Sequence, residues 1–406
     1  MKINIIFLVI VLSYNSSAQS FKSFTKADGL PSNNVLCASS DREGTIWFGT
    51  QRGIAIYNGD NWEVMTTNTH PGLANDNVSS ILVATNGTVW AAGDYGASFY
   101  DGTSWTTYKA ADGLGSSRIT NISEIENGHI WLSDFNGATL YDGTSFTAYK
   151  TEDGLPFGGV EDVLELDNGN IIMATSLSGI AIYDGKNFSF VTESEGLLSD
   201  NTTALLKDKK GNIWVGTSAG VSVFDANMSW TGNHTRMYKM PEPDTLNPVE
   251  DLAIDSEGNI WSGIYVDYLV TVGGVAKYDG FTWSDYDNDQ GIVGPTIRSL
   301  LVDEMDNVWV TTSSGITKIS NVSANVDKID KRDFITYPNP VQDQLYLELG
   351  DLKKPLLIQL INNKGSIVLE KYVVHTSETS LIVSNLEPGV YTLLVGEITK
   401  QIIVFP

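Results

Sequence analysis

The feature that most constrains the fold is a short motif around tryptophan that recurs at a regular interval. The stretch Gly44 to Trp62 reads GTIWFGTQRGIAIYNGDNW, and variants of it return along three quarters of the chain. The tryptophan of its Ile-Trp pair recurs at spacings of 43, 41, 41, 42, 47 and 48 residues, as Trp47, Trp90, Trp131, Ile172, Trp214, Trp261 and Trp309. A period in this range, with several short alternating apolar runs per unit, is typical of a β-propeller and not of a helical solenoid.

Each unit contains the same segments in the same order. Each unit begins with a loop of the Asp-Gly-Leu kind and an apolar strand, and a turn with glycine then leads to the Ile-Trp strand. The third strand runs from Gly to Tyr. A Tyr-Asp-Gly turn connects it to the last strand, which begins with Trp or Phe. Glycine supplies the positive φ that tight hairpins require. One such unit cannot bury its apolar faces alone, so the core is expected between neighbouring units. The sequence predicts an all-β fold with a seven-bladed β-propeller over residues 19–320.

The two ends of the repeat region indicate how the propeller closes. Phe21 to Phe24 match the last strand of a unit, whereas the seventh unit stops at Ile319, after its third strand. We expect the amino-terminal segment to supply the missing outer strand of the seventh blade. Such closure leaves no free edge between the first and last blades.

The first 18 residues have the composition of an export signal. Lys2 precedes an apolar run from Ile3 to Leu12, and small residues stand at Ser16 and Ala18, where cleavage is expected after Ala18. The apolar run is too short to span a bilayer, so no transmembrane anchor is expected.

Charge and cysteine content exclude several kinds of partner. The formal net charge is −24, which argues against nucleic acid and against an anionic membrane surface. Cys37 is the only cysteine, so no internal disulfide can form, and its place in an apolar alternation predicts a buried thiol.

The segment after the repeats differs in composition and reads as a second domain. A polar linker is expected over 321–335, and residues 336–406 carry seven acidic residues and five lysines, a net charge of −2. Short strands are expected at 345–349, 356–361, 366–373, 380–383, 389–395 and 400–404, separated by turn residues. This spacing predicts a small Ig-like β-sandwich.

The recurrent pattern Gly-x-Ile-Trp-x-Gly-Thr-x-x-Gly-Ile-x-x-Tyr resembles the two-component regulator propeller repeat over about residues 19 to 320. In that family the repeats form periplasmic sensors of membrane histidine kinases, often sensors of oligosaccharides. Since the sequence shows no transmembrane helix, kinase or DNA-binding domain, only the propeller is carried over. The repeat is also similar to that of streptogramin lyases, whose catalytic histidine pattern is not visible here.

The tail closely resembles the type A carboxy-terminal sorting domain of the type IX secretion system. The motifs that carry this resemblance are Tyr337-Pro-Asn-Pro340, Asn363-Lys-Gly365, Leu386-Glu-Pro-Gly-Val-Tyr391 and Lys400-Gln-Ile-Ile-Val404. The resemblance implies a Bacteroidota protein that passes through the periplasm and is delivered across the outer membrane by the type IX secretion machinery, which residues 336–406 would contact. It also implies a secreted or surface-attached product from which the domain is usually cleaved.

The best pointers to function are departures from the repeat on the face where two sets of loops emerge: the loops between blades and those between the second and third strands. One insertion, around 264–273, carries Tyr265 and Tyr268, and another interrupts the fifth blade over 226–248. Amide and carboxylate groups beside exposed aromatic rings on this face suit the hydroxyl groups and faces of sugars. The predicted ligand-binding residues are Asn34, Asn77, Tyr95, Arg118, Phe135, Phe157, Asn201, Tyr265 and Tyr268.

We therefore expect a secreted or cell-surface binding module for a glycan or a surface partner, rather than an enzyme. The alternative is a polysaccharide lyase or hydrolase-like propeller enzyme, for which Arg118 and Tyr265 are the only candidate residues; a scaffold without a small ligand is a third hypothesis. The sequence does not decide the ligand, the oligomeric state, or whether the cargo is anchored or released.

No cofactor, catalytic residue or metal ligand is assigned. The four histidines fall in different units or domains without metal-ligand spacing. Asp285, Asp287 and Asp289 resemble the start of a calcium loop, but Gln290 stands where glycine is required, and calcium at this run is left open.

Overall fold

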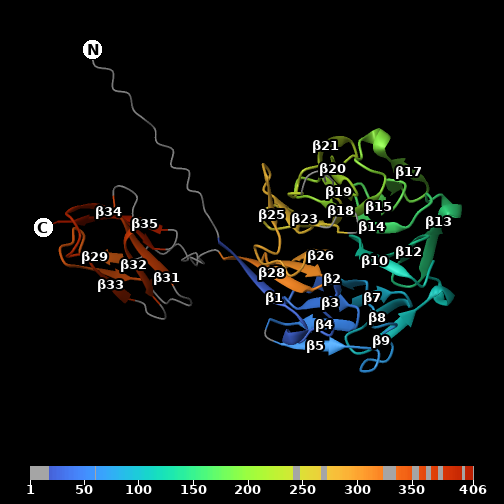
Figure 1. Cartoon of the computed structure of the whole chain (residues 1–406), viewed down its shortest axis with the longest axis horizontal. Helices are drawn as coiled ribbons and strands as arrows, with labels where there is room; N and C mark the ends of the chain where they lie inside the picture. Colours follow the sequence, from blue (N-terminus) through green and yellow to red (C-terminus); the bar gives the residue numbers. More distant parts are fainter. Residues whose placement is uncertain are drawn as a thin grey trace, which may run out of the picture. The chain divides into compact units, whose positions relative to one another are not determined.

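The computed structural model describes residues 18–59, 61–240, 247–266, 272–322, 335–349, 356–362, 367–373, 378–395 and 398–405 (Figure 1). The chain forms two compact units, of which one is Ser20–Ser320 and the other contains Asn321–Pro406. Apart from Ala18, the predicted export signal lies outside the described residues, as does the predicted linker apart from residues 321, 322 and 335.

The first unit is a β-propeller of seven four-stranded antiparallel sheets, six of which follow the order of the sequence. Figure 1 shows these blades following one another around a common centre. The first strands of the blades are β2 (Val35–Ser40), β6 (Ser80–Val83), β10 (Ile119–Glu124), β14 (Val160–Glu165), β18 (Thr202–Lys207), β22 (Val249–Ile254) and β26 (Ile297–Val302). The second strands, which carry the tryptophans, are β3 (Ile46–Thr50), β7 (Val89–Gly93), β11 (Ile130–Asp134), β15 (Ile171–Thr175), β19 (Ile213–Thr217), β23 (Ile260–Ile264) and β27 (Val308–Thr312).

The third and fourth strands complete each blade. The third strands are β4 (Gly53–Tyr57), β8 (Gly96–Tyr100), β12 (Gly137–Tyr141), β16 (Ile180–Tyr183), β20 (Gly220–Phe224), β24 (Val275–Tyr278) and β28 (Gly315–Val322). The fourth strands of the first six blades are β5 (Trp62–Met65), β9 (Trp105–Tyr108), β13 (Phe146–Lys150), β17 (Phe188–Val191), β21 (Trp230–His234) and β25 (Trp283–Tyr286).

The seventh blade has the sheet order β1-β28-β27-β26, with β1 (Ala18–Phe24) as its outer strand. The amino-terminal closure expected from the sequence is therefore confirmed. Phe24 of β1 is buried in the cluster that joins the last blade to the first, and its ring stacks on Trp309 with centroids 5.9 Å apart.

The first strands of neighbouring blades contact one another in a closed ring, so they surround the propeller axis. In six of them the pairing with the second strand skips one residue, the second of the strand, which is a β-bulge. The skipped residues, with Ser79 at the corresponding place before β6, form what we call the axial ring. Its members, each partly exposed, are Leu36, Ser79, Thr120, Glu161, Thr203, Glu250 and Arg298.

Three Asp-Gly-Leu segments and one Glu-Gly-Leu segment form short 3₁₀ turns. These turns are η1 (Lys26–Asp28), η2 (Ala110–Asp112), η3 (Thr151–Asp153) and η4 (Glu193–Glu195). In η1 the Asp28 carboxylate accepts the Thr25 backbone N–H at 2.8 Å, and Gly29 then adopts a φ of 122° that a side chain would disfavour. The leucine that follows, Leu30 in this loop, is buried between blades. The motif therefore forms the turn that connects two blades, and its leucine fills the space between them.

Seven apolar clusters in the propeller each combine residues of two neighbouring blades, which confirms that the core forms between units. Ile54 and Met65 of the first blade, for example, pack with Ile81 and Val89 of the second. Cys37 belongs to this cluster and is buried as expected, and burial raises the pKa of its thiol to about 12.

The second unit is a β-sandwich. One sheet has the order β29-β30-β33 and the other β32-β31-β34-β35. A shared core of buried side chains from both sheets includes Leu345, Leu360 and Leu393. The strands are β29 (Ile335–Tyr337), β30 (Gln344–Glu348), β31 (Leu356–Ile361), β32 (Ile367–Val373), β33 (Glu378–Ile382), β34 (Gly389–Val395) and β35 (Ile398–Val404).

Candidate functional site

The candidate site lies on the face formed by the loops between blades and by the turns between second and third strands. In the second blade the turn between β7 and β8 contains Asp94 and Tyr95. A side chain on Gly96 would lie 2.2 Å from the Tyr108 carbonyl oxygen, and Gly96 has a φ of 120°. The tight turn that glycine permits leaves the neighbouring Tyr95 side chain 62% exposed.

Three polar and aromatic groups from two blades converge at this turn. Arg118, in the loop before β10, pairs through Nε with Asp94 Oδ1 at 3.0 Å. Its guanidinium carbon lies 4.4 Å from the ring centroid of Phe135, in the turn between β11 and β12. Asn77 Nδ2 donates to Asp94 Oδ2 at 3.3 Å. The two Asp94 oxygens thus hold Arg118 and Asn77, and the guanidinium group is positioned over an aromatic face.

Exposed apolar side chains continue from this cluster across the next blades. The backbone around Gly158 and Gly159 runs against two turns, because a Cβ on Gly159 would lie 3.0 Å from Phe135 Cα and one on Gly158 would lie 3.3 Å from Leu177 Cβ. Phe157 is adjacent in the chain. We call Tyr95, Phe135, Phe157 and Leu177 the apolar strip, whose members are 62%, 48%, 77% and 60% exposed.

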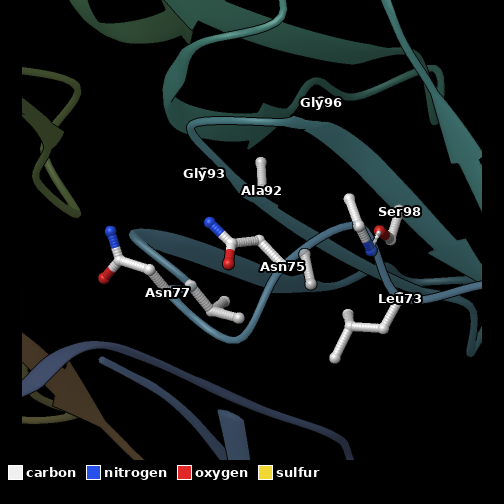
Figure 2. Close-up of a pocket in the computed structure, with 10 residues that line it drawn as sticks. Leu73, Asn75, Asn77, Ala92, Gly93, Gly96 and Ser98 are labelled. Atoms are coloured by element: carbon white, nitrogen blue, oxygen red, sulfur yellow. Dashed lines mark hydrogen bonds between the residues drawn. The ribbon is translucent and has the colours of Figure 1, made fainter. Parts of the chain in front are cut away.

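Asn77 also borders a small pocket beside β7 and β8 that is partly open to solvent. Figure 2 shows the amide side chains of Asn75 and Asn77 on the side of Gly93, with Leu73 and Ser98 on the other side. Asn77 Oδ1 is buried without a hydrogen-bond partner among the described residues. The pocket therefore has an unsatisfied acceptor at its edge.

Asn34 and Asn201 occupy equivalent turns in the first and fifth blades, and their recorded contacts are local. The Asn34 carbonyl accepts the Gln51 N–H at 3.2 Å, and the Asn201 carbonyl accepts the Ser218 N–H at 3.0 Å. Asn34 Oδ1, like Asn77 Oδ1, is buried without a hydrogen-bond partner among the described residues. The structure thus brings Asn77, Arg118 and Phe135 together around Asp94, with Tyr95 and Phe157 in adjoining segments. Among the described residues no side-chain hydrogen bond joins Asn34 or Asn201 to this group.

The insertion in the sixth blade is described only in part. Tyr265 follows β23, is 37% exposed, and donates its backbone N–H to Pro248 at 2.8 Å; Tyr268 lies outside the described residues. The insertion of the fifth blade meets this loop, because the Tyr238 hydroxyl donates to the Gly273 carbonyl at 3.2 Å. Arg118 and Tyr265, the candidate catalytic pair, share no recorded contact in the part of the chain that the structure describes.

The acidic run considered for calcium is engaged with a lysine. Lys239 Nζ lies 3.1 Å from Asp285 Oδ2 and 3.0 Å from Asp287 Oδ2. Within the described residues no group of three or more His, Cys, Asp or Glu side chains could hold a metal ion. His234 stacks on Trp214 with ring centroids 5.2 Å apart, and burial lowers its pKa.

Two groups of residues were missed from the sequence. Asp94 and Leu177 lie in the same turns as predicted residues, and their place between the second and third strands would have identified them. The axial ring was missed because a β-bulge rotates one residue out of the strand alternation. Glu161 and Glu250 are its acidic members, and burial raises the pKa of both carboxyl groups.

These features define a closed seven-bladed β-propeller followed by a β-sandwich, with the fold class predicted from the sequence confirmed. Residues 336–404 match the family model of the secretion system C-terminal sorting domain, and residues 29–52 and 196–219 match the two component regulator propeller. Both resemblances inferred from the motifs are thereby confirmed: the chain carries propeller repeats of this kind and a sorting domain that marks it for export.

Solved structures share the fold at low sequence identity. One of them is PorZ of Porphyromonas gingivalis, which is described as an essential bacterial surface component of the type-IX secretion system. Its sequence is 14% identical and its TM-score is 0.61, and the match covers 93% of this chain and 60% of PorZ. The extracellular domain of the putative hybrid two component system BT3049 of B. thetaiotaomicron is 17% identical with a TM-score of 0.62, covering 95% of this chain and 54% of that chain. This chain therefore spans less than two thirds of either structure.

An enzyme is among the solved structures that share the fold. Virginiamycin B lyase of Staphylococcus aureus is 12% identical with a TM-score of 0.55, covering 75% of this chain and 99% of the lyase. A comparison with curated protein sequences found no match. No helix in the described ranges is both long and apolar enough to cross a membrane.

Proposed function

We propose that the protein is a secreted or cell-surface propeller that binds a glycan through the apolar strip, with Asp94, Arg118 and Asn77 supplying polar contacts. The sorting domain supports export, and the description of PorZ as a surface component supports a place at the cell surface. The observation that carries the glycan proposal is the guanidinium group of Arg118, held over Phe135 and paired with Asp94 between exposed rings.

The chemistry of the strip fits a sugar chain better than a purely apolar partner. Flat aromatic faces can cover the C–H faces of pyranose rings, while carboxylate, amide and guanidinium groups hydrogen-bond hydroxyl groups. Arg118 uses Nε for Asp94, which leaves its other N–H groups to meet a ligand. Four exposed apolar side chains over three consecutive blades would otherwise cost free energy in water, since apolar area is favourably buried.

The test is a glycan array with the purified chain lacking residues 1–18, compared with the Tyr95→Ala/Phe135→Ala/Phe157→Ala variant. We expect at least one glycan class to bind and the triple variant to lose roughly tenfold or more in affinity, since each ring contributes about 1 kcal/mol. Phe281→Ala is the matched control, because Phe281 is 91% exposed but lies in the turn between the third and fourth strands of the sixth blade.

The outcomes separate this proposal from its rivals. Binding that survives the triple variant but is lost in Tyr265→Ala/Tyr268→Ala would move the site to the insertion of the sixth blade. Binding to no glycan would overturn the proposal and favour a protein partner or a scaffold.

A further inference from the structure

The axial ring has a pattern in which small hydroxyl side chains join neighbouring blades. Ser79 Oγ donates to the Ile119 carbonyl at 3.1 Å, and Thr120 Oγ1 to the Val160 carbonyl at 3.3 Å. Thr203 Oγ1 donates to the Val249 carbonyl at 2.8 Å. Each bond runs from the ring residue of one blade to the first residue of the first strand in the next blade. At these three positions a hydroxyl side chain is sufficient to link neighbouring blades.

Three members of the ring carry charges instead. Glu161 and Glu250 belong to the fourth and sixth blades, and Arg298 belongs to the seventh. Among the described residues the Glu250 carboxyl group makes no hydrogen bond or ion pair, and Arg298 Nε is buried without an acceptor. A hydrogen bond with the Ser176 side chain partly offsets the rise that burial causes in the pKa of Glu161. No pair of these side chains is bridged within 4 Å.

The charged groups of Glu161 and Arg298 both act on the carboxyl group of Glu250. Burial raises the pKa of Glu250 to about 8, while the guanidinium group of Arg298 opposes the rise and Asp251 and Glu161 add to it. Holding a charged group away from water without a partner is costly, and a bound cation would favour the ionised form of the Glu250 carboxyl group. Since hydroxyl side chains serve the fold at equivalent positions, the charges are not needed for closure. Unfavourable groups gathered in one place are characteristic of binding sites.

We propose that the axial ring binds a small zwitterionic molecule, whose ammonium group lies between the carboxylates of Glu161 and Glu250 and whose anionic group pairs with Arg298. The ligand must carry both a positive and a negative group because the ring offers both acidic and basic side chains. The carboxylates lie on either side of the fifth blade, and the guanidinium group lies on the seventh. The remaining members are uncharged: Thr203 lies on the fifth blade between the two carboxylates, and Leu36, Ser79 and Thr120 lie on the first three blades.

The first test measures binding by titration calorimetry on the chain lacking residues 1–18. The probes are glycine, γ-aminobutyrate and phosphoethanolamine, which carry both signs, and ethanolamine and acetate, which carry one. We expect at least one zwitterion to bind about tenfold or more tightly than either single-sign probe. Glu250→Gln and Arg298→Gln should each weaken that binding by a similar factor. The controls are Glu43→Gln and Arg42→Gln, since both residues are exposed in the turn between β2 and β3.

A second test does not depend on the choice of probe. Glu250→Thr should raise the melting temperature of the unliganded protein by about 2 °C or more, because a hydroxyl group could donate to the Ile297 carbonyl as Thr203 does to Val249. A lower melting temperature would show that the charge serves the fold and would overturn the proposal. Equal binding of zwitterions and single-sign probes, or of none, would overturn it as well.

Discussion

At the residue scale, a carboxylate in the turn before the second strand holds the repeat tryptophan in three blades. Asp303 Oδ2 accepts the Trp309 indole N–H at 2.8 Å, and the Asn307 amide donates to both Asp303 oxygens at 2.8 and 2.9 Å. Asp208 and Asp255 hold Trp214 and Trp261 in the same way at 3.0 Å. In the third blade Ile125 takes the place of the carboxylate, and Trp131 Nε1 is buried without a partner among the described residues.

This contrast predicts the effect of removing one carboxylate. Asp303→Ala should lower the free energy of unfolding by roughly 2–4 kcal/mol, because it leaves a buried indole N–H and a buried amide unsatisfied. Urea unfolding followed by tryptophan fluorescence measures the change. Glu304→Ala, at an exposed residue of the same turn, is the control and should change stability by less than about 0.5 kcal/mol. Equal effects of the two variants would contradict a stabilising role for the clamp.

At the element scale, the strand β1 joins the two ends of the propeller. Phe24 contacts the rings of Tyr57 and Trp62 in the first blade at centroid distances of 5.4 and 5.5 Å, and Trp309 in the seventh at 5.9 Å. A strand from one end of the chain thereby buries aromatic surface against both the first and last blades. The closure rests on this aromatic contact together with the pairing of β1 with β28 in the sheet of the seventh blade.

Truncation of this side chain tests the closure. Phe24→Ala should lower the free energy of unfolding by about 3–5 kcal/mol, the usual cost of removing a buried phenylalanine side chain. Phe281→Ala, which removes a 91% exposed ring, should have little effect. The measurement is thermal and urea unfolding of the chain lacking residues 1–18. If both variants unfold alike, β1 does not close the propeller in solution.

At the scale of the whole molecule, each compact unit has its own core. The sandwich buries residues such as Leu345 and Leu393 within its two sheets, and the propeller core lies between blades. A unit with its own core can fold without the other. The export role of the sorting domain is therefore separable from the binding role proposed for the propeller.

Deletion of residues 336–406 tests this separation. We expect the shortened chain to keep the melting temperature of the propeller and to accumulate in the periplasm of its host instead of at the cell surface or in the medium. Cell fractionation with immunoblotting measures the location, and circular dichroism measures the folding. Surface delivery of the shortened chain would show that export does not require the sorting domain.

Much of this organisation could be predicted from the sequence because it depends on local patterns. The Ile-Trp repeat and its glycine turns define the blades, the unmatched segments at Phe24 and Ile319 indicate the closure, and the motif at Tyr337 to Pro340 identifies the tail. Hairpins of this kind are set by neighbouring residues, so their strands and turns can be located without coordinates.

The sites could be predicted only in part, since they depend on contacts between blades. Arg118 and Phe135 were expected on one face, but their pairing with Asp94 arises where two loops from different blades meet. The charged residues of the axial ring were missed because a β-bulge shifts them out of the alternating pattern. By itself the sequence determined the blades, their closure and the export address, through periodicity and local turn chemistry. Only the tertiary structure decided which loop residues converge and which charges face the axis, because those neighbours are set by packing between units about 40 residues apart in the chain.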